Sequence, residues 1–221
     1  MRTQTMAPGV AVAVDGTSAD RAVLDWAAQE AERGEGPLLL AHAAGHLHPQ
    51  LTFAERHVVR TEVMARGERI LQDAAAYVHR LVPGLPVTTV VRLLDKDAVV
   101  PALAGQAPVV ARVSPAWGAG GGWARGPVVA AVNDVDSDAH VVDFATDYAA
   151  RRGLDITVLA SAGGDASRQL LEQSRHTSLL LLPRPQPRGS KTSYSWPTAL
   201  DVLRRSRNPV ALVSGRSRHA G

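Results

Sequence analysis

The 221-residue sequence contains no cysteine. This absence excludes disulfide bonds, thiolate zinc sites, iron–sulfur clusters and cysteine nucleophiles. Long apolar runs are also missing, and the longest leucine block, Leu179 to Leu182, is far shorter than the roughly 18 residues that span a bilayer. The first eight residues lack a basic segment followed by an apolar stretch. We therefore expect a cytoplasmic protein that does not enter a membrane.

The sequence also lacks an excess of charge of one sign. It has 24 basic and 21 acidic residues, which gives a formal charge of +3, and neither sign is gathered into a run. Only Lys96 and Lys191 are lysines, so the pI of 9.8 reflects arginine, which is never neutral. We predict no nucleic-acid partner.

An internal duplication is the most informative feature. Residues 10–41 align without a gap with residues 128–159, an offset of 118 positions, and the match includes Asp20 with Asp138 and Trp26 with Phe144. A glycine-rich stretch at 118–122 separates the two copies. We predict a first domain at 1–115, a linker at 116–126 and a second domain at 127–221.

Strands and helices alternate along the first copy. Apolar runs predict strands at 10–14, 38–42, 87–93 and 108–113. Helical spacing predicts helices that end at Gly34, that cover 53–81, and that run to Leu103 after a cap at Asp95 or Asp97. This alternation specifies an α/β fold, a parallel sheet with helices on both faces.

The second copy is shorter. It begins with the same strand, helix and strand as the first copy. The pattern then predicts a helix at 166–173, a strand at 178–182, a helix at 198–205 and a strand at 209–213. The second copy has no counterpart of the long helix at 53–81 or of the strand that follows. Each copy is incomplete, so we expect self-association or a pseudo-dimer of the two copies, with another protein chain as a possible partner.

Three segments carry a family resemblance: residues 10–18, which end in Asp15-Gly16-Thr17-Ser18, residues 22–28 and residues 38–42. Together they resemble the universal stress protein family, and the repeat resembles its tandem two-domain type. The proline followed by valines at 108–113 and 209–213 is similar to the family's closing strand. The resemblance implies two Rossmann-like domains of the adenine nucleotide alpha hydrolase-like type, dimeric pairing and, in one branch, ATP at the carboxyl edge of the sheet.

That branch has a phosphate loop with three glycines and a hydroxyl residue. Aligned back from the last strand, those positions are Pro183, Gln186, Trp196 and Pro197 here. Glycine is needed because backbone N–H groups must approach the phosphates closely, and proline has no N–H to donate. In the first copy the segment from Leu103 to Pro108 joins the third helix directly to the last strand, so the fourth strand and its loop are predicted to be missing.

Asp15 ends the first strand, where ligands bind in open α/β sheets. By resemblance it is the acid near the nucleotide, and its other interpretation is a turn and cap residue. An alternative ATP site with magnesium would use the residues near these strand ends, namely Asp15, Gly16, Ala41, Arg184, Gly189, Ser190 and Thr192.

Two clusters of possible metal ligands, one acidic and one of histidines, are better explained by structural roles than by metal binding. Asp134, Asp136 and Asp138 lack the rest of a calcium-loop pattern, so acids at a helix start are the better interpretation. His42, His46, His48 and His57 have no spacing that fixes a common geometry. No metal site is predicted, and no nucleophile motif is found.

The sequence therefore favours a universal stress protein-like stress-response protein that is not an enzyme, needs no cofactor and acts by protein–protein contacts. The alternative is a stress sensor that binds adenine nucleotide at the carboxyl edge of the sheet.

Overall fold

The computed structural model describes residues 9–18, 20–34, 36–112, 126–160, 166–185, 194–206 and 208–215. The chain divides into two compact units, unit 1 at residues 1–111 and unit 2 at residues 112–221. Most of the predicted linker at 116–126 falls outside the described residues.

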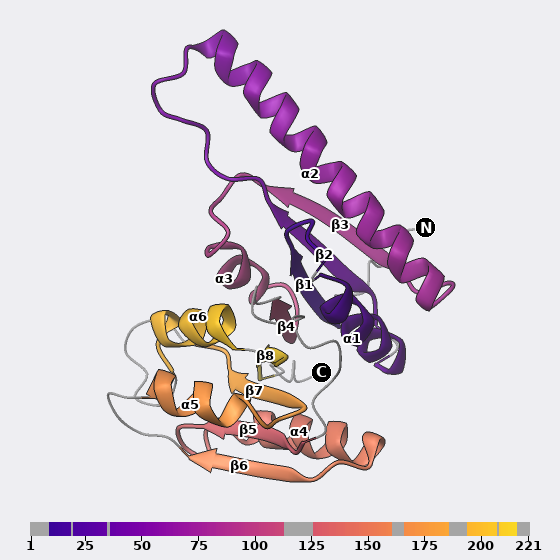
Figure 1. The fold of residues 1–221 in the computed structure, drawn as a ribbon, viewed down its shortest axis with the longest axis vertical. Helices are drawn as coiled ribbons and strands as arrows, with labels where there is room; N and C mark the ends of the chain where they lie inside the picture. Colours follow the sequence, from indigo (N-terminus) through magenta and orange to yellow (C-terminus); the bar gives the residue numbers. More distant parts are fainter. Residues whose placement is uncertain are drawn as a thin grey trace, which may run out of the picture. The chain divides into compact units, whose positions relative to one another are not determined.

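Unit 1 is a parallel α/β unit. Its elements are β1 (Val10–Val14), α1 (Asp20–Arg33), β2 (Leu38–Ala43), α2 (Phe53–Leu81), β3 (Val87–Arg92), α3 (Val99–Leu103) and β4 (Val109–Arg112). The strand order is β3-β2-β1-β4, and β2 pairs in parallel with both β1 and β3. Right-handed crossovers place α1 and α2 on one face, where they contact each other, and α3 on the other. The predicted fold class is confirmed (Figure 1).

Helix α2 explains much of the packing of unit 1. Thr52 and Glu55 form a capping box, in which the Thr52 N–H donates to the Glu55 carboxylate at 2.9 Å. The buried residues of α2, Gly67, Leu71, Ala74 and Val78, all lie in its second half. A Cβ at Gly67 would lie 2.8 Å from Val91 Cγ1, so glycine permits the close approach to the sheet. The first half runs past the ends of β2 and β3 (Figure 1).

Unit 2 repeats the plan with fewer parts. Its elements are β5 (Val128–Val132), α4 (Ala139–Arg152), β6 (Ile156–Ala160), α5 (Ala166–Ser174), β7 (Leu179–Pro183), α6 (Trp196–Arg205) and β8 (Val210–Val213). The strand order is β8-β7-β5-β6 with parallel pairing throughout. Crossover handedness places α4 on one face and α5 and α6, which contact each other, on the other.

Each unit is shortened on a different side. Among the described residues, one strand, β4, lies beyond β1 in unit 1, whereas two strands, β7 and β8, lie on the matching side of β5 in unit 2. On the opposite side, β3 lies beyond β2 but no described strand of unit 2 lies beyond β6. Each unit therefore has four strands among the described residues.

Two helix starts differ from the prediction. The N-cap of α3 is Ala98, and neither Asp95 nor Asp97 takes that position, because a backbone turn from Asp95 O to Ala98 N precedes the helix. Helix α6 begins at Trp196 rather than at Thr198, because the Ser195 hydroxyl caps it by accepting from Thr198 N–H. No helix among the described residues is long and apolar enough to span a membrane.

Candidate functional site

The turn after β1 contains the first two predicted site residues. The Asp15 side chain accepts a hydrogen bond from Thr17 N–H at 3.1 Å, as its interpretation as a turn residue predicts. Its carboxylate is 32% exposed and lies 4.0 Å from Lys96 Nζ. Gly16 has φ +85°, and a Cβ there would lie 3.1 Å from Ile70 on α2. This turn therefore requires glycine for both its backbone conformation and its packing.

The backbone N–H groups of this turn are directed at a carboxylate of the protein itself. Asp20, the first residue of α1, is 6% exposed, and its Oδ2 accepts from Gly16 N–H at 2.7 Å and from Asp15 N–H at 3.2 Å. Burial and the nearby negative charge of Asp15 raise the pKa of Asp20 to about 6, while the N–H donors oppose that rise. Asp20 thus occupies the position at the strand end where an anion would be bound.

The second copy has the same arrangement. Asp138 precedes α4, is 3% exposed, and its Oδ2 accepts from Asn133 N–H at 3.0 Å. The sequence repeat pairs Asp20 with Asp138 and Asp15 with Asn133, so this duplicated acid was visible in the sequence. Asp20 carries no further site signal in the sequence, because an acid at a helix start is expected for the helix dipole alone.

The other acids of this turn do not converge with Asp138. Asp134 accepts from the Ser137 hydroxyl at 2.6 Å, which lowers the pKa of Asp134 below its ordinary value. Asp136 donates its own N–H to Asp134. Among the residues that the structure describes, no group of three acids or histidines could hold a metal ion.

The four histidines of the first copy are also dispersed. His42 is buried, with Nδ1 3.0 Å from Val14 O, and His46 Nε2 lies 3.3 Å from Asp95 Oδ2. His48 accepts from Gln50 N–H, and His57 lies on α2. Each of these rings has separate surroundings.

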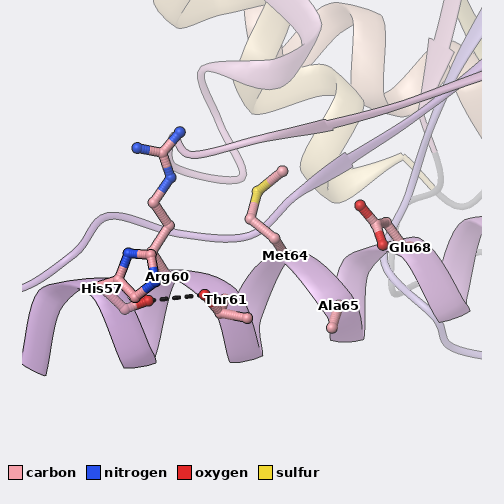
Figure 2. A pocket seen from close by; sticks show the side chains of 6 residues that line it. All are labelled: His57, Arg60, Thr61, Met64, Ala65 and Glu68. Carbon is pink, nitrogen blue, oxygen red and sulfur yellow. Dashed lines mark hydrogen bonds between the residues drawn. The ribbon is translucent and has the colours of Figure 1, made fainter.

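A hollow of about 390 Å³ lies along α2 between His57 and Glu68 (Figure 2). It is lined by six residues at helical spacing, His57, Arg60, Thr61, Met64, Ala65 and Glu68. Figure 2 shows Arg60, Met64 and Glu68 extending from the same side of the helix, and the Thr61 hydroxyl donates to His57 O at 2.9 Å. This hollow has charges of both signs and contains none of the predicted site residues.

The remaining predicted site residues belong to both units. Ala41 is fully buried within β2, in register with Ala13 and Val90. Arg184 directly follows β7, its N–H donates to Val213 O at 2.8 Å, and its buried Nε has no hydrogen-bond partner among the described residues. Gly189, Ser190 and Thr192 lie outside the described residues.

Solved structures with the same arrangement of elements extend over nearly the whole chain. A universal stress protein from Archaeoglobus fulgidus has a TM-score of 0.57 at 11% identity, over 93% of this chain and 96% of that chain. The chain has the universal stress protein fold. A functionally unknown protein, PA1789 from Pseudomonas aeruginosa, has a TM-score of 0.51 at 12% identity, over 94% and 92% of the two chains. No protein-family model matches the sequence, and no curated protein matches it either.

Within this universal stress protein fold, the positions predicted to replace the phosphate-loop glycines have other structural roles. Pro183 is the last residue of β7, and Trp196 and Pro197 are the first two residues of α6. The Ser195 hydroxyl already accepts an N–H group of that helix start. Gln186 lies outside the described residues.

Proposed function

We propose that this chain is a stress-response protein of the universal stress type that acts through contacts with other proteins, without nucleotide and without catalysing a reaction. The observation that carries the proposal is the buried carboxylate of Asp20, whose Oδ2 lies 2.7 Å from Gly16 N and 3.2 Å from Asp15 N. A phosphate placed on the same N–H groups would have to displace this carboxylate or meet its negative charge.

The second copy supports the same interpretation. The Asp138 carboxylate accepts a hydrogen bond from Asn133 N–H, and the Ser195 hydroxyl accepts one from Thr198 N–H at the start of α6. Strand-end and helix-start donors are where this kind of sheet binds phosphate. Because these donors already have partners in the protein, binding a triphosphate there would require breaking existing hydrogen bonds.

The test is thermal unfolding of the purified chain with and without ATP and Mg²⁺, ADP or AMP at millimolar concentration. A ligand present at about a hundred times its dissociation constant adds roughly 2.7 kcal/mol, or about 2–4 °C for a chain of this size. We expect no shift with any of the three nucleotides. A rise of that size with ATP would contradict the proposal.

One observation favours the second candidate, an adenine-nucleotide sensor that binds ATP with magnesium. Arg184 directly follows β7, and its buried Nε has no hydrogen-bond partner among the described residues. A buried guanidinium whose Nε–H has no partner is suited to donate a hydrogen bond to a phosphate oxygen. In unit 2 the residues predicted to act with it are Gly189, Ser190 and Thr192, and the predicted nucleotide-binding residues of unit 1 are Asp15, Gly16 and Ala41.

This candidate predicts an ATP-induced shift that Arg184→Ala abolishes. The matched control is Arg168→Ala, because Arg168 is 75% exposed on α5 and pairs with Glu172 on the same helix. The sensor would retain its ATP response in the control. Equal ATP-induced shifts in the two variants would show that Arg184 does not contribute to an ATP site.

A further inference from the structure

Strands β2 and β6 occupy equivalent positions in the repeat but have opposite exposure. The offset of 118 places Ile156 on Leu38 and Val158 on Leu40. All six residues of β2 are buried. In β6, Ile156 is 38% exposed and Val158 is 44% exposed.

The difference arises from what covers each strand. In unit 1, β3 pairs with the outer edge of β2, and α2 packs on its face. A Cβ at Gly67 of α2 would lie 3.0 Å from His42 Cδ2, so His42, and with it Leu38 and Leu40 at alternate positions, belongs to the face under α2. Among the described elements of unit 2, β6 pairs only with β5, and no second helix lies beside α4. Among the described elements, none covers the outer edge of β6 or the face that carries Ile156 and Val158.

The chemistry of β6 suits pairing with another strand. Its sequence, ITVLA, has no charge and no proline, and three of its five residues are β-branched. An edge strand of this kind presents unpaired N–H and C=O groups to any strand that approaches, and natural edges usually carry charge or proline. The outer strand of unit 1, β3, instead has two threonines and ends in Arg92.

We propose that β6 is an interface between two copies of this chain, in which the two β6 strands pair antiparallel about a two-fold axis at Val158. The same strand on both copies then forms a self-complementary contact, and the outer backbone groups of β6 find partners. The two-fold axis stands perpendicular to the sheet, so α4 of each copy lies on the same face. The α4 helix of the partner subunit then takes the position beside α4 that α2 takes beside α1 in unit 1.

Helix α4 has the properties that this position requires. Trp26 of α1 is 1% exposed, whereas its equivalent Phe144 is partly exposed on α4. Asp25 of α1 accepts from Tyr77 of α2 at 2.7 Å, and its equivalent on α4 is the exposed Asp143. The side of α4 that corresponds to the contact of Asp25 with α2 thus carries an exposed acid next to a partly exposed aromatic residue.

The charges on α4 favour antiparallel helices. Asp143 and Asp147 lie in the middle turns, and Arg151 and Arg152 are in the last turn. Two antiparallel copies bring the acids of one helix toward the basic turn of the other, whereas parallel copies would place like charges side by side. The strand edge and the helix charges therefore favour the same two-fold arrangement.

This inference deepens the proposed function by naming one protein partner, a second copy, and its test is separate from the nucleotide test. The mass of the full chain in solution is measured by light scattering at micromolar concentrations. We expect twice the chain mass of 23.4 kDa for the wild type and a single-chain mass for Val158→Lys. The control is Val58→Lys, because Val58 is 54% exposed on α2, and it should remain a dimer.

Because the chain has no cysteine, a single engineered thiol gives a second readout that does not depend on the lysine variant folding. In the proposed register Val158 faces its own copy across the axis, at a Cα separation of about 4.5–5.5 Å that a disulfide can bridge. Val158→Cys should form a covalent dimer on mild oxidation, and Val58→Cys should not. A wild type that stays a single chain, or a Val158→Cys variant that crosslinks no faster than Val58→Cys, would overturn the proposal.

Discussion

Units 1 and 2 share a duplicated core and differ in what surrounds it. Both have a buried strand, a turn whose N–H donates to a buried aspartate, and a helix that returns to a second strand. In unit 1 the second strand is covered by α2 and β3, but no described element does this in unit 2. The comparison teaches that the burial of a duplicated residue is decided by its neighbours more than by its own chemistry.

The largest expected contrast is between the aromatic residues that the repeat aligns. Trp26→Ala removes a fully buried side chain and should lower the free energy of unfolding by about 3–5 kcal/mol. Phe144→Ala should cost less than half as much, because Phe144 is partly exposed. Urea denaturation in the Val158→Lys background, where the chain is expected to be a single copy, measures both. Equal losses would mean that α2 is not what separates the two helices.

The duplicated aspartates give the next contrast. Asp138→Ala leaves the Asn133 N–H without its side-chain acceptor and should cost about 1–3 kcal/mol at neutral pH. Asp20→Ala removes the same kind of acceptor, but it also removes a buried charge whose pKa is raised to about 6. Asp20→Ala should therefore cost less than Asp138→Ala at pH 7.5. The opposite ranking would show that the Asp20 charge is not unfavourable in the folded protein.

The pH dependence of stability isolates that charge. The unfolded chain releases the Asp20 proton near pH 3.8 and the folded chain near pH 6, so the folded chain holds more protons in between. The extra proton on Asp20 stabilises the folded chain fully below pH 3.8, and this stabilisation is lost as the pH rises through 6. The free energy of unfolding should therefore fall by roughly 1 kcal/mol between pH 5 and pH 7.5. Asp20→Asn should remove this loss relative to the wild type. Parallel pH profiles for the two proteins would contradict the assignment.

The smallest expected contrast is between Asp25 on α1 and Asp143 on α4, which the repeat aligns with each other. Asp25→Ala removes the hydrogen bond from Tyr77 and should cost about 1 kcal/mol. Asp143→Ala alters an exposed side chain and should change stability by less than about 0.5 kcal/mol. Both are measured in the Val158→Lys background. A cost at Asp143 as large as that at Asp25 would indicate a partner for α4 within the single chain.

The local features of the fold were predictable because their signals are local. The apolar stripe of α2 and the Pro83-Gly84 pair after it gave its observed bounds, Phe53 to Leu81. The turn at Asp15 and Gly16 was also expected from residue type. Gly67 carried no such signal, since a glycine inside a helix becomes informative only when the sheet that approaches it is known.

The candidate site was harder to predict because its partners are set by the folded backbone. The repeat shows that the acid at Asp20 is duplicated, but its residue type does not distinguish an acceptor of the turn N–H groups from an acid that only favours a helix start. The exposure of β6 depends on which strands pair across the whole unit. The sequence indicated this only by the lack of a counterpart in the second copy to the helix at 53–81 and the strand after it. The part of the alternative site at Gly189, Ser190 and Thr192 stays a prediction.

The central claim is that the open edge of unit 2 serves protein contact and does so without nucleotide. Sedimentation of the full chain with and without ATP and Mg²⁺ tests it most directly. The account predicts twice the 23.4 kDa chain mass in both conditions and a single-chain mass for Val158→Lys. A single-chain mass for the wild type, or a dimer that forms only with ATP, would contradict it.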